Sequence, residues 1–326
     1  MAKVAADNLA PVLERRFGPV QVTDLRRVSG GASRETWLFD ATDRDGTRHE
    51  LVVRRDPAPG IGSTDRATEF ALLEATHAAG VPVPAVVMML TPNDDLGSGF
   101  VMQRIDGETI PRRILRDDAY HEARSTMAAA CGSIAAAIHA TPLDGLPPLP
   151  VQSASDQLEQ WTAMLDAFGE PHPVFELALR WMHERLPATH TEPRLVHGDF
   201  RNGNFIVGPD GIRAVLDWEL AHLGDPIEDL GWLCARAWRF GVDRVVGGFG
   251  DIDDLLDAYA TRSGIRPDED TLRFWVALAT LKWGVMCLIQ TFTHLNGVVR
   301  SVELAAIGRR VVENEWDLMR LMEGNW

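Results

Sequence analysis

Cysteine is scarce in this sequence. Only three cysteines occur in 326 residues, Cys131, Cys234 and Cys287, and their separations match no metal-ligand spacing. Isolated cysteines also cannot supply the disulfide framework of a small secreted domain. We therefore expect reduced, mostly buried thiols in a cytoplasmic protein.

An excess of basic residues is also lacking. Lys and Arg number 32 against 47 Asp and Glu, which gives a formal charge of −15. Up to residue 105 there are 12 basic and 14 acidic residues, and after it 20 and 33, so most of the excess lies in the second part. Such a surface argues against nucleic acid and anionic membrane as partners. It permits a cationic substrate, although solubility alone explains the charge equally well.

No long uninterrupted apolar run is present. The most apolar long stretch, residues 274–292, has Lys282 in its middle, so we expect a buried helix and no membrane span. Residues 1–7 lack the apolar core of a signal peptide. The apolar content of 45% is ordinary for a globular protein, and the length suffices for one large domain or two lobes.

Lysine is almost absent. The chain has 30 Arg but only two Lys, Lys3 and Lys282. A position that usually carries Lys can therefore be expected to hold Arg.

Three polar residues between apolar runs form the most informative pattern. Asn204 follows Asp199 by five residues, and Asp217 follows thirteen further on. The apolar runs are 195–196, 205–207 and 214–216, with a turn at 208–211. This spacing is typical of a kinase catalytic centre, in which Asp199 would accept a proton from an attacking hydroxyl while Asn204 and Asp217 hold magnesium ions. The alternative is a solvated loop between core strands, which explains one carboxylate more easily than three spaced positions.

The motifs in this block resemble those of the aminoglycoside phosphotransferase family of small-molecule kinases. That family shares its fold with choline kinases and protein kinases. The motifs are H-G-D-F-R-N-G-N at 197–204, D-W-E at 217–219 and G-D-P-I-E-D-L at 224–230. The segment D-W-E-L-A-H-L-G-D-P at 217–226 is similar to the subgroup that accompanies acyl-CoA dehydrogenases. The resemblance covers about residues 24–295.

The resemblance implies a nucleotide site in the first third of the chain. Ser29, Gly30, Gly31 and Ser33 lie between two strand-like segments, where small residues let backbone amides approach phosphates. Ser33 would be the polar contact. An ordinary hairpin turn is the alternative.

A third strand, 50–55, would carry the other nucleotide contacts. Val52 and Arg54 share one face of it, because side chains alternate along a strand. By resemblance Val52 would contact adenine, and Arg54 would replace the usual phosphate-binding Lys, with Glu69 as its partner. A solvated strand end for Arg54 and Arg55, and a surface Glu in the first turn of a helix, are the alternatives.

The segment 99–107 is similar to the family's hinge. Met102 ends a predicted strand, and the backbone groups of Gln103 and Ile105 would form hydrogen bonds with adenine.

The order of elements favours an α+β, two-lobed layout, and the family resemblance implies that the fold is protein-kinase-like. Residues 1–105 would form a small β-rich N-lobe, and residues 106–326 a larger helical C-lobe with the catalytic loop and acceptor pocket. Helices are expected, among others, at 5–17, 68–79, 117–140, 227–240 and 302–322.

The acceptor pocket is less well defined by the sequence. Trp232, Trp238, Trp275 and Trp283 lie in helices that would wall it, although Trp at helical spacing is usually core. Acidic residues at 251–257 could attract an amine, but a solvated helix face explains them as well.

These observations predict an enzyme that transfers the γ-phosphoryl group of ATP, or of GTP, to a hydroxyl of a small molecule with Mg²⁺. Asp199 is the expected base, and Arg201 the cation beside the transferring phosphate. The acceptor alternatives are an aminoglycoside or macrolide antibiotic and a hydroxylated acyl metabolite. A pseudokinase that binds nucleotide without turnover is the alternative from another class, supported only by the missing Lys.

Overall fold

The computed structural model describes residues 4–28, 35–56, 65–187 and 192–326, and the chain divides into two compact units. The first unit combines Met1–Gly107 with two later segments, Pro142–Pro148 and Arg213–Leu220. The second unit consists of Glu108–Thr141, Leu149–Ile212 and Ala221–Trp326.

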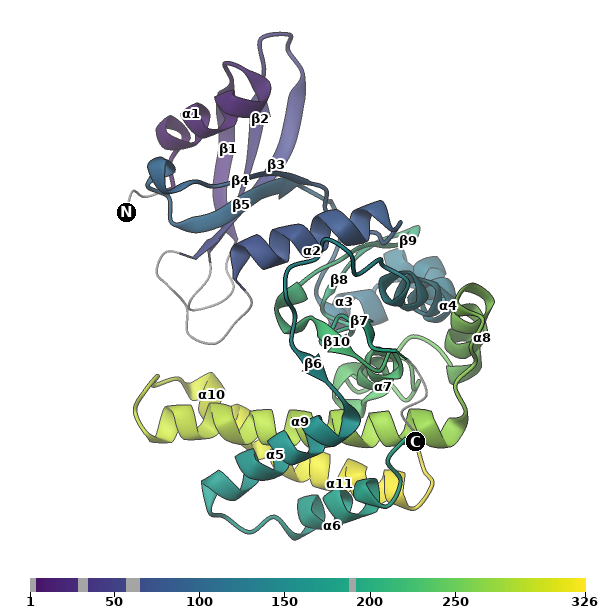
Figure 1. The fold of residues 1–326 in the computed structure, drawn as a ribbon. Coiled ribbons are helices and arrows are strands. Elements are labelled where there is room, and N and C mark those ends of the chain that lie inside the picture. Colours follow the sequence, from purple (N-terminus) through teal and green to yellow (C-terminus); the bar gives the residue numbers. More distant parts are fainter. Residues whose placement is uncertain (1–3, 29–34, 57–64, 188–191) are drawn as a thin grey trace. The chain divides into compact units, whose positions relative to one another are not determined.

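The first unit is built on a five-stranded sheet in the spatial order β1-β2-β3-β5-β4, with every neighbouring pair antiparallel (Figure 1). Its strands are β1 (Gln21–Val28), β2 (Glu35–Thr42), β3 (Arg48–Asp56), β4 (Val86–Met89) and β5 (Ser98–Gln103). Its helices are α1 (Ala6–Phe17), α2 (Arg66–Ala78) and the short 3₁₀ helix η1 (Pro92–Asp94). The expected strand-rich first third is therefore present.

The two faces of β3 have different partners. Leu51 and Val53 belong to a buried apolar cluster with Leu9 and Leu13 of α1. Because side chains alternate along a strand, Arg54 leaves the opposite face, where it meets α2. The alternation read from the sequence thus correctly separates Arg54 from the side chains of β3 that pack against α1.

A late segment of the chain completes the first unit. It contains most of β9 (Gly211–Val215) and the 3₁₀ helix η3 (Trp218–Leu220). The Val215 amide donates to the Pro82 carbonyl at 2.8 Å, which ties this segment to the residues after α2. Asp217 lies between β9 and η3, and thus belongs to the unit that also contains Arg54.

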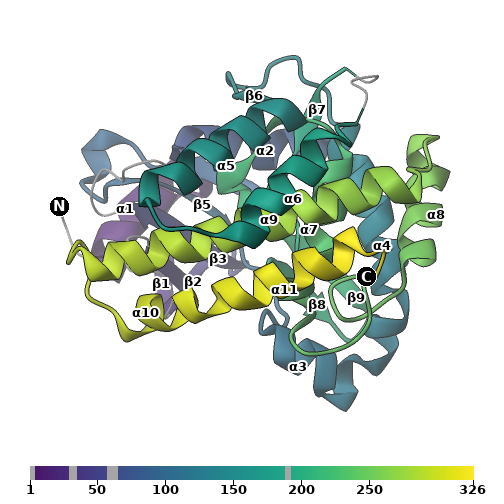
Figure 2. The same ribbon diagram turned by 90° about the horizontal axis from the view of Figure 1, so that it is seen from below.

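The second unit is a helical body around α9 (Glu269–Leu295), which packs against α5, α6, α7, α10 and α11. Figure 2 shows α5, α6 and α11 running alongside α9. The other helices are α3 (Pro111–Arg116), α4 (His121–His139), α5 (Ala154–Phe168), α6 (Pro173–His183), α7 (Ile227–Cys234), α8 (Ile252–Ser263), α10 (Val302–Ile307) and α11 (Val311–Met322). Three further 3₁₀ helices are η2 (Asp118–Tyr120), η4 (Arg236–Arg239) and η5 (Gly308–Arg310).

Short strands of the second unit flank the loop that holds the His-Gly-Asp motif. β6 (Val151–Gln152), β10 (His222–Gly224) and β7 (Arg194–Val196) form a three-stranded sheet, and β8 (Phe205–Gly208) follows the loop. The loop itself occupies the residues between β7 and β8. Because strands fix both of its ends, its polar side chains start from a rigid base.

The apolar helix expected around Lys282 is α9. Among the described residues it is the one helix long and apolar enough to cross a membrane, yet 78% of its apolar window is buried among other parts of the protein. Burial of this kind is what the core helix of a globular unit requires.

Three predicted helices have different bounds. The helix expected over 227–240 ends at Cys234, because Ala235 is extended (φ −59°, ψ 138°) and η4 follows. The one expected over 302–322 is interrupted by η5, where Gly308 lies against α9: a Cβ there would fall 2.0 Å from the Thr291 hydroxyl. The helix expected from residue 117 begins at His121, after the 3₁₀ turn η2. Helical periodicity continues across all three breaks, so the sequence pattern did not reveal them.

Candidate active site

The loop after β7 is held from beneath by a buried carboxylate, Asp229 on α7. Its Oδ2 accepts the His197 amide at 2.8 Å, and its Oδ1 accepts the Gly198 amide at 3.0 Å. Asp229 has no exposed surface. Two hydrogen bonds from consecutive amides to one carboxylate fix the direction in which the chain enters Asp199.

A histidine and a tyrosine compensate the buried charge of Asp229. His139 Nε2 lies 3.1 Å from Asp229 Oδ2, and its Nδ1 lies 3.0 Å from the Tyr259 hydroxyl. Burial by itself raises the pKa of Asp229, but the hydrogen bond and charge of His139, with further contributions from His197, outweigh it and lower that pKa. His139 therefore supports the loop by holding Asp229 in its ionised form.

Three side-chain donors converge on the carboxylate of Asp199. Arg201 Nε and Trp232 Nε1 each donate to Oδ1 at 2.8 Å, and Asn204 Nδ2 donates to Oδ2 at 2.6 Å. Donors on both oxygens leave the carboxylate little rotational freedom. An ionised, oriented carboxylate is what a general base for a hydroxyl proton needs.

The local sequence explains how the loop reaches this geometry. The Asn204 amide donates to the Arg201 carbonyl at 3.0 Å, which closes a turn. Gly203 within that turn has φ +112°, and a Cβ there would lie 2.7 Å from Arg201 Nη1. A side chain at position 203 would therefore strain the backbone and displace Arg201.

A tryptophan cluster adjoins Asp199. Arg201 lies over the ring of Trp238 at 4.4 Å, and the ring of Trp238 lies 5.3 Å from Trp232 and 4.9 Å from Trp283. Trp232 thus serves two purposes, since its ring packs in the cluster while its N–H orients the Asp199 carboxylate. Three of the four tryptophans expected to wall the acceptor pocket meet here. Trp275, the fourth, packs against Phe274 instead.

Lys282 and Glu228 are further polar residues next to the loop. Lys282 Nζ lies 3.4 Å from the Gly198 carbonyl, 3.4 Å from Glu228 Oε1 and 4.7 Å from the Trp232 ring centroid. Burial raises the pKa of Glu228, but the charges of His222 and Lys282 lower it overall. This position of Lys282 beside the loop does not follow from the sequence motifs. Its rarity in a chain with only two Lys, inside an apolar helix, was the available signal.

In the first unit Arg54 makes the contact expected of it. Its Nη1 lies 3.0 Å from Glu69 Oε1, and its Nη2 pairs with Asp217 Oδ1. The predicted ion pair with Glu69 is confirmed, and the contact with Asp217 is additional. Arg66 also pairs with Glu69, through the other carboxylate oxygen, a contact that the sequence did not predict.

Arg55 points to the other face of the sheet. It pairs with Glu35 at 2.8 Å and donates to the Leu96 carbonyl at 2.8 Å, and only 4% of its surface is exposed. The predicted register of β3 is confirmed. The alternative of a solvated strand end is wrong for both arginines, because each is buried against carboxylates.

The predicted adenine contacts lie at the β3–β5 pair. Val52 and Met102 are buried and directly paired across the strands. The Gln103 amide donates to the Ala85 carbonyl at 2.8 Å, so only its carbonyl is left for the proposed contact with adenine. Ile105, the other predicted hinge contact, lies just after β5. Ser29, Gly30, Gly31 and Ser33 lie outside the described residues.

The two predicted metal ligands have the donor chemistry that Mg²⁺ requires. Asn204 uses its amide nitrogen on Asp199, which leaves its carbonyl oxygen for a cation. Asp217 offers a carboxylate with a side chain that is 42% exposed. Mg²⁺ is commonly held by one or two such oxygens together with substrate phosphates. Among the described residues there is no group of three or more His, Cys, Asp or Glu that could hold a metal ion by itself.

Comparison with known proteins identifies the class to which the fold and these residues belong. Residues 24–275 match the Phosphotransferase enzyme family, and the chain is a member of it. A putative aminoglycoside phosphotransferase from Ralstonia eutropha superposes with a TM-score of 0.74 over 99% of both chains at 20% identity. A thermostable mutant of an aminoglycoside phosphotransferase, solved with AMP-PNP and hygromycin B, superposes with a TM-score of 0.64 over 97% of this chain and 99% of that one at 16% identity. The protein-kinase-like fold expected from the sequence is confirmed.

A curated relative connects the chain to the subgroup expected from its motifs. This chain is 28% identical over 328 residues to acyl-CoA dehydrogenase family member 10 of Mus musculus. The matched region covers 92% of this chain and 29% of that protein. The chain thus spans about a third of the length of the relatives of this kind. The resemblance to the kinase-like region of acyl-CoA dehydrogenase family members is confirmed.

Proposed function

We propose that this phosphotransferase is an ATP- and magnesium-dependent kinase that acts on a hydroxyl group of a small organic molecule. The observation that carries the proposal is the Asp199 carboxylate, oriented by Asn204, Arg201 and Trp232 in a His-Gly-Asp loop. A solvated loop would not need a tryptophan from another helix directed at its carboxylate.

Each proposed step has a residue to perform it. Asp199 accepts the proton of the acceptor hydroxyl while the hydroxyl oxygen forms a bond to the γ-phosphorus of ATP. The bond between the γ-phosphorus and the bridging β-phosphate oxygen breaks, and ADP is released. Arg201 stabilises the negative charge on the transferring group. Arg54, held by Glu69, binds the nucleotide phosphates. Asn204 and Asp217 are the proposed magnesium ligands, and the cation neutralises phosphate charge when bound.

Among the two acceptor classes, we propose a hydroxylated acyl compound. The similarity to an acyl-CoA dehydrogenase family member supports it. An aminoglycoside acceptor is the second candidate, supported by the likeness in fold to a hygromycin B complex. The ion pair between Arg54 and Glu69 counts against the pseudokinase alternative, because that alternative rested on the absence of Lys at this position.

The experiment that tests the proposal is a screen for acceptor-dependent ADP formation. The protein is incubated with ATP, Mg²⁺ and a panel of hydroxyacyl compounds, aminoglycosides and macrolides, and products are detected by mass spectrometry. We expect a phosphorylated product with wild type and none with Asp199→Asn. Nucleotide-dependent thermal stabilisation without ADP formation for any acceptor would instead support the pseudokinase.

A further inference from the structure

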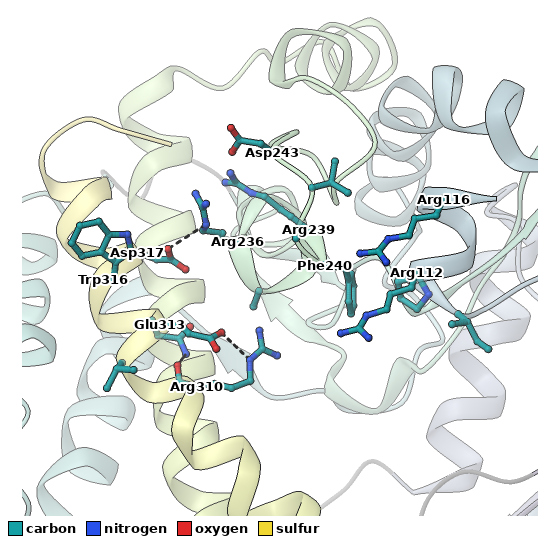
Figure 3. Close-up of a pocket in the computed structure, with 17 residues that line it drawn as sticks. Arg112, Arg116, Arg236, Arg239, Phe240, Asp243, Arg310, Glu313, Trp316 and Asp317 are labelled. Carbon is teal, nitrogen blue, oxygen red and sulfur yellow. Dashed lines mark hydrogen bonds and ion pairs between the residues drawn. The ribbon is translucent and has the colours of Figure 1, made fainter. Parts of the chain in front are cut away.

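A large cavity in the second unit has a lining rich in arginine (Figure 3). Its volume is about 1160 Å³. The five arginines are Arg112 and Arg116 of α3, Arg236 and Arg239 of η4, and Arg310 of η5. Three carboxylates also line it, so the lining has an excess of two positive charges. This excess contrasts with the −15 charge of the whole chain.

Only part of this positive charge is neutralised within the protein. Arg310 pairs with Glu313 at 3.1 Å, and Arg236 lies 3.6 Å from Asp317. Arg112, Arg116 and Arg239 make no ion pair within the ranges that the structure describes. Figure 3 shows Arg112 and Arg116 next to each other, as expected one turn apart on α3. Two adjacent unpaired guanidinium groups form a site that can hold an oxyanion from two sides.

Arg239 is the least expected of the five. Only 3% of the surface of Arg239 is exposed. Its Nε and Nη2 groups donate hydrogen bonds to the Cys234 carbonyl, at 3.3 and 2.9 Å. Burial lowers the pKa of Arg239. The charges of Asp317 and Asp243 oppose this shift, but both carboxylates lie beyond ion-pair distance of the guanidinium. A buried guanidinium without a contacting carboxylate is costly, and a bound anion would remove that cost.

The cavity adjoins the catalytic loop. Phe240, in its wall, packs against the cluster that contains Trp232 and Trp238, and Trp232 donates to Asp199. Pro111, on another side, has its Cγ 3.4 Å from the place where a Cβ of Gly203 would lie. A molecule in the cavity would therefore lie next to residues that position the proposed base.

Exposed apolar side chains also line the cavity. Ile110 is about half exposed, and Val312 and Trp316 are largely exposed. Large exposed apolar groups around a charged site indicate a ligand with an apolar part as well as an anionic one.

We propose that this cavity binds the acceptor through a multiply charged oxyanion, such as a phosphate or pyrophosphate, joined to an apolar, hydroxyl-bearing part. The inference rests on the proposed kinase function and narrows its substrate class. A polycationic acceptor would be repelled by the unpaired arginines of the cavity, so binding of such an acceptor is disfavoured.

Binding of pyrophosphate tests the anion site directly. The nucleotide site is first saturated with AMP-PNP and Mg²⁺, and pyrophosphate is then titrated by calorimetry into wild type, Arg112→Gln, Arg116→Gln and the double variant. Loss of charge-assisted hydrogen bonds should weaken binding about tenfold in the double variant. Arg113→Gln is the matched control, because Arg113 lies on the same helix, is exposed and pairs with Glu108 outside the cavity lining. It should bind pyrophosphate like wild type.

A pair of acceptors tests the link to turnover. 3-Hydroxybutyryl-coenzyme A carries phosphate and pyrophosphate groups, whereas its N-acetylcysteamine thioester presents the same acyl group without them. We expect a KM at least about tenfold lower for the former, and we expect Arg112→Gln/Arg116→Gln to remove most of that difference with little change in kcat.

The outcomes separate the inference from the proposed function. Failure of wild type to bind pyrophosphate, or equal binding by the double variant, would overturn the inference. Turnover restricted to aminoglycosides, unaffected by the double substitution, would also overturn it while leaving the kinase function intact. Pyrophosphate binding that needs Arg112 and Arg116, in a protein that phosphorylates no acceptor, would support the anion site and refute the kinase function.

Discussion

Arg54 holds Glu69 by an ion pair of 3.0 Å, and Glu69 is held a second time by Arg66. Glu69 therefore keeps a cationic partner when Arg54 is removed. This arrangement makes position 54 suitable for substitution, because the functional contact can be lost without leaving a buried carboxylate unpaired.

The first prediction follows from that arrangement. Arg54→Lys should retain substantial activity, because an ammonium keeps the charge, whereas Arg54→Ala should lose most of it by releasing the nucleotide phosphates. Thermal unfolding of both variants should stay close to wild type. Steady-state kinetics with varied ATP is the measurement. Normal activity of Arg54→Ala would remove this residue from the phosphate site.

Arg55→Ala provides the contrast. The sequence alone suggested that this change would do little, but the structure shows a buried guanidinium bound to Glu35 and to the Leu96 carbonyl. Its loss should lower the free energy of unfolding by about 1–3 kcal/mol, because the buried Leu96 carbonyl loses this donor. Glu35 then keeps the longer ion pair with Arg27, at 3.5 Å, and the hydrogen bond from Trp37. Urea unfolding measures this, and an unchanged midpoint would contradict it.

The second prediction concerns Asp199, the proposed general base. Asp199→Asn should reduce kcat by about 10²–10⁴, as losses of general bases do, while ATP affinity changes little. Asp166→Asn, an exposed carboxylate of α5, is the control and should behave as wild type. Turnover of Asp199→Asn within a few-fold of wild type would exclude Asp199 as the base.

The third prediction concerns Asp217, the proposed magnesium ligand. Its φ of +63° lies in the left-handed region, which Asn tolerates better than Ala. Asp217→Asn therefore removes the charge with little added backbone strain and should nearly abolish transfer by weakening magnesium–ATP binding. Calorimetric titration of ATP with and without Mg²⁺ checks this. The same dependence on magnesium in wild type and variant would refute the assignment.

The fourth prediction separates orientation of the base from packing. Trp232→Phe keeps an aromatic ring for Trp238 and Lys282 but removes the N–H that donates to Asp199 Oδ1. We expect kcat to fall about tenfold, the magnitude of one lost hydrogen bond to a charged group, with KM for ATP unchanged. Trp283→Phe is the control, because the ring of Trp283 contacts Trp238 and its N–H does not donate to Asp199. Equal loss of kcat in both variants would indicate packing alone.

The fifth prediction concerns pH. Burial raises the pKa of Asp317 to about 6, against an ordinary value of 3.8, although Arg236 opposes the shift. The folded protein thus binds this proton more tightly than the unfolded chain, so the contribution of Asp317 to stability falls as pH rises from about 4 to 6. Asp317→Asn should remove this decrease in stability between about pH 4 and 6, because the amide does not titrate.

Urea unfolding at pH 4.5 and 7 measures the effect of Asp317. From pH 4.5 to pH 7, the free energy of unfolding of Asp317→Asn should rise relative to that of wild type by on the order of 1–2 kcal/mol. This is less than the full pKa shift implies, because solvent partly screens the carboxylate. A constant difference between the two proteins at both pH values would show that the pKa of Asp317 is not raised in the folded state.

The sequence by itself determined the order of the strands and helices, the catalytic motif and the side of β3 from which Arg54 emerges. These features are local. Alternation along a strand separates Arg54 from Arg55 whatever packs around them, and the interval between Asp199 and Asn204 is fixed by one closed turn. The family resemblance rests on the same short-range spacings.

The tertiary structure alone decided which distant residues complete the site. Trp232 lies 33 positions after the carboxylate that it orients, Arg66 shares Glu69 with Arg54, and the arginine-lined cavity combines residues of α3, η4 and η5. No periodicity encodes these contacts. They arise because α7, α9 and the segments around them bury their apolar faces together, and the positions of the polar side chains follow from that packing.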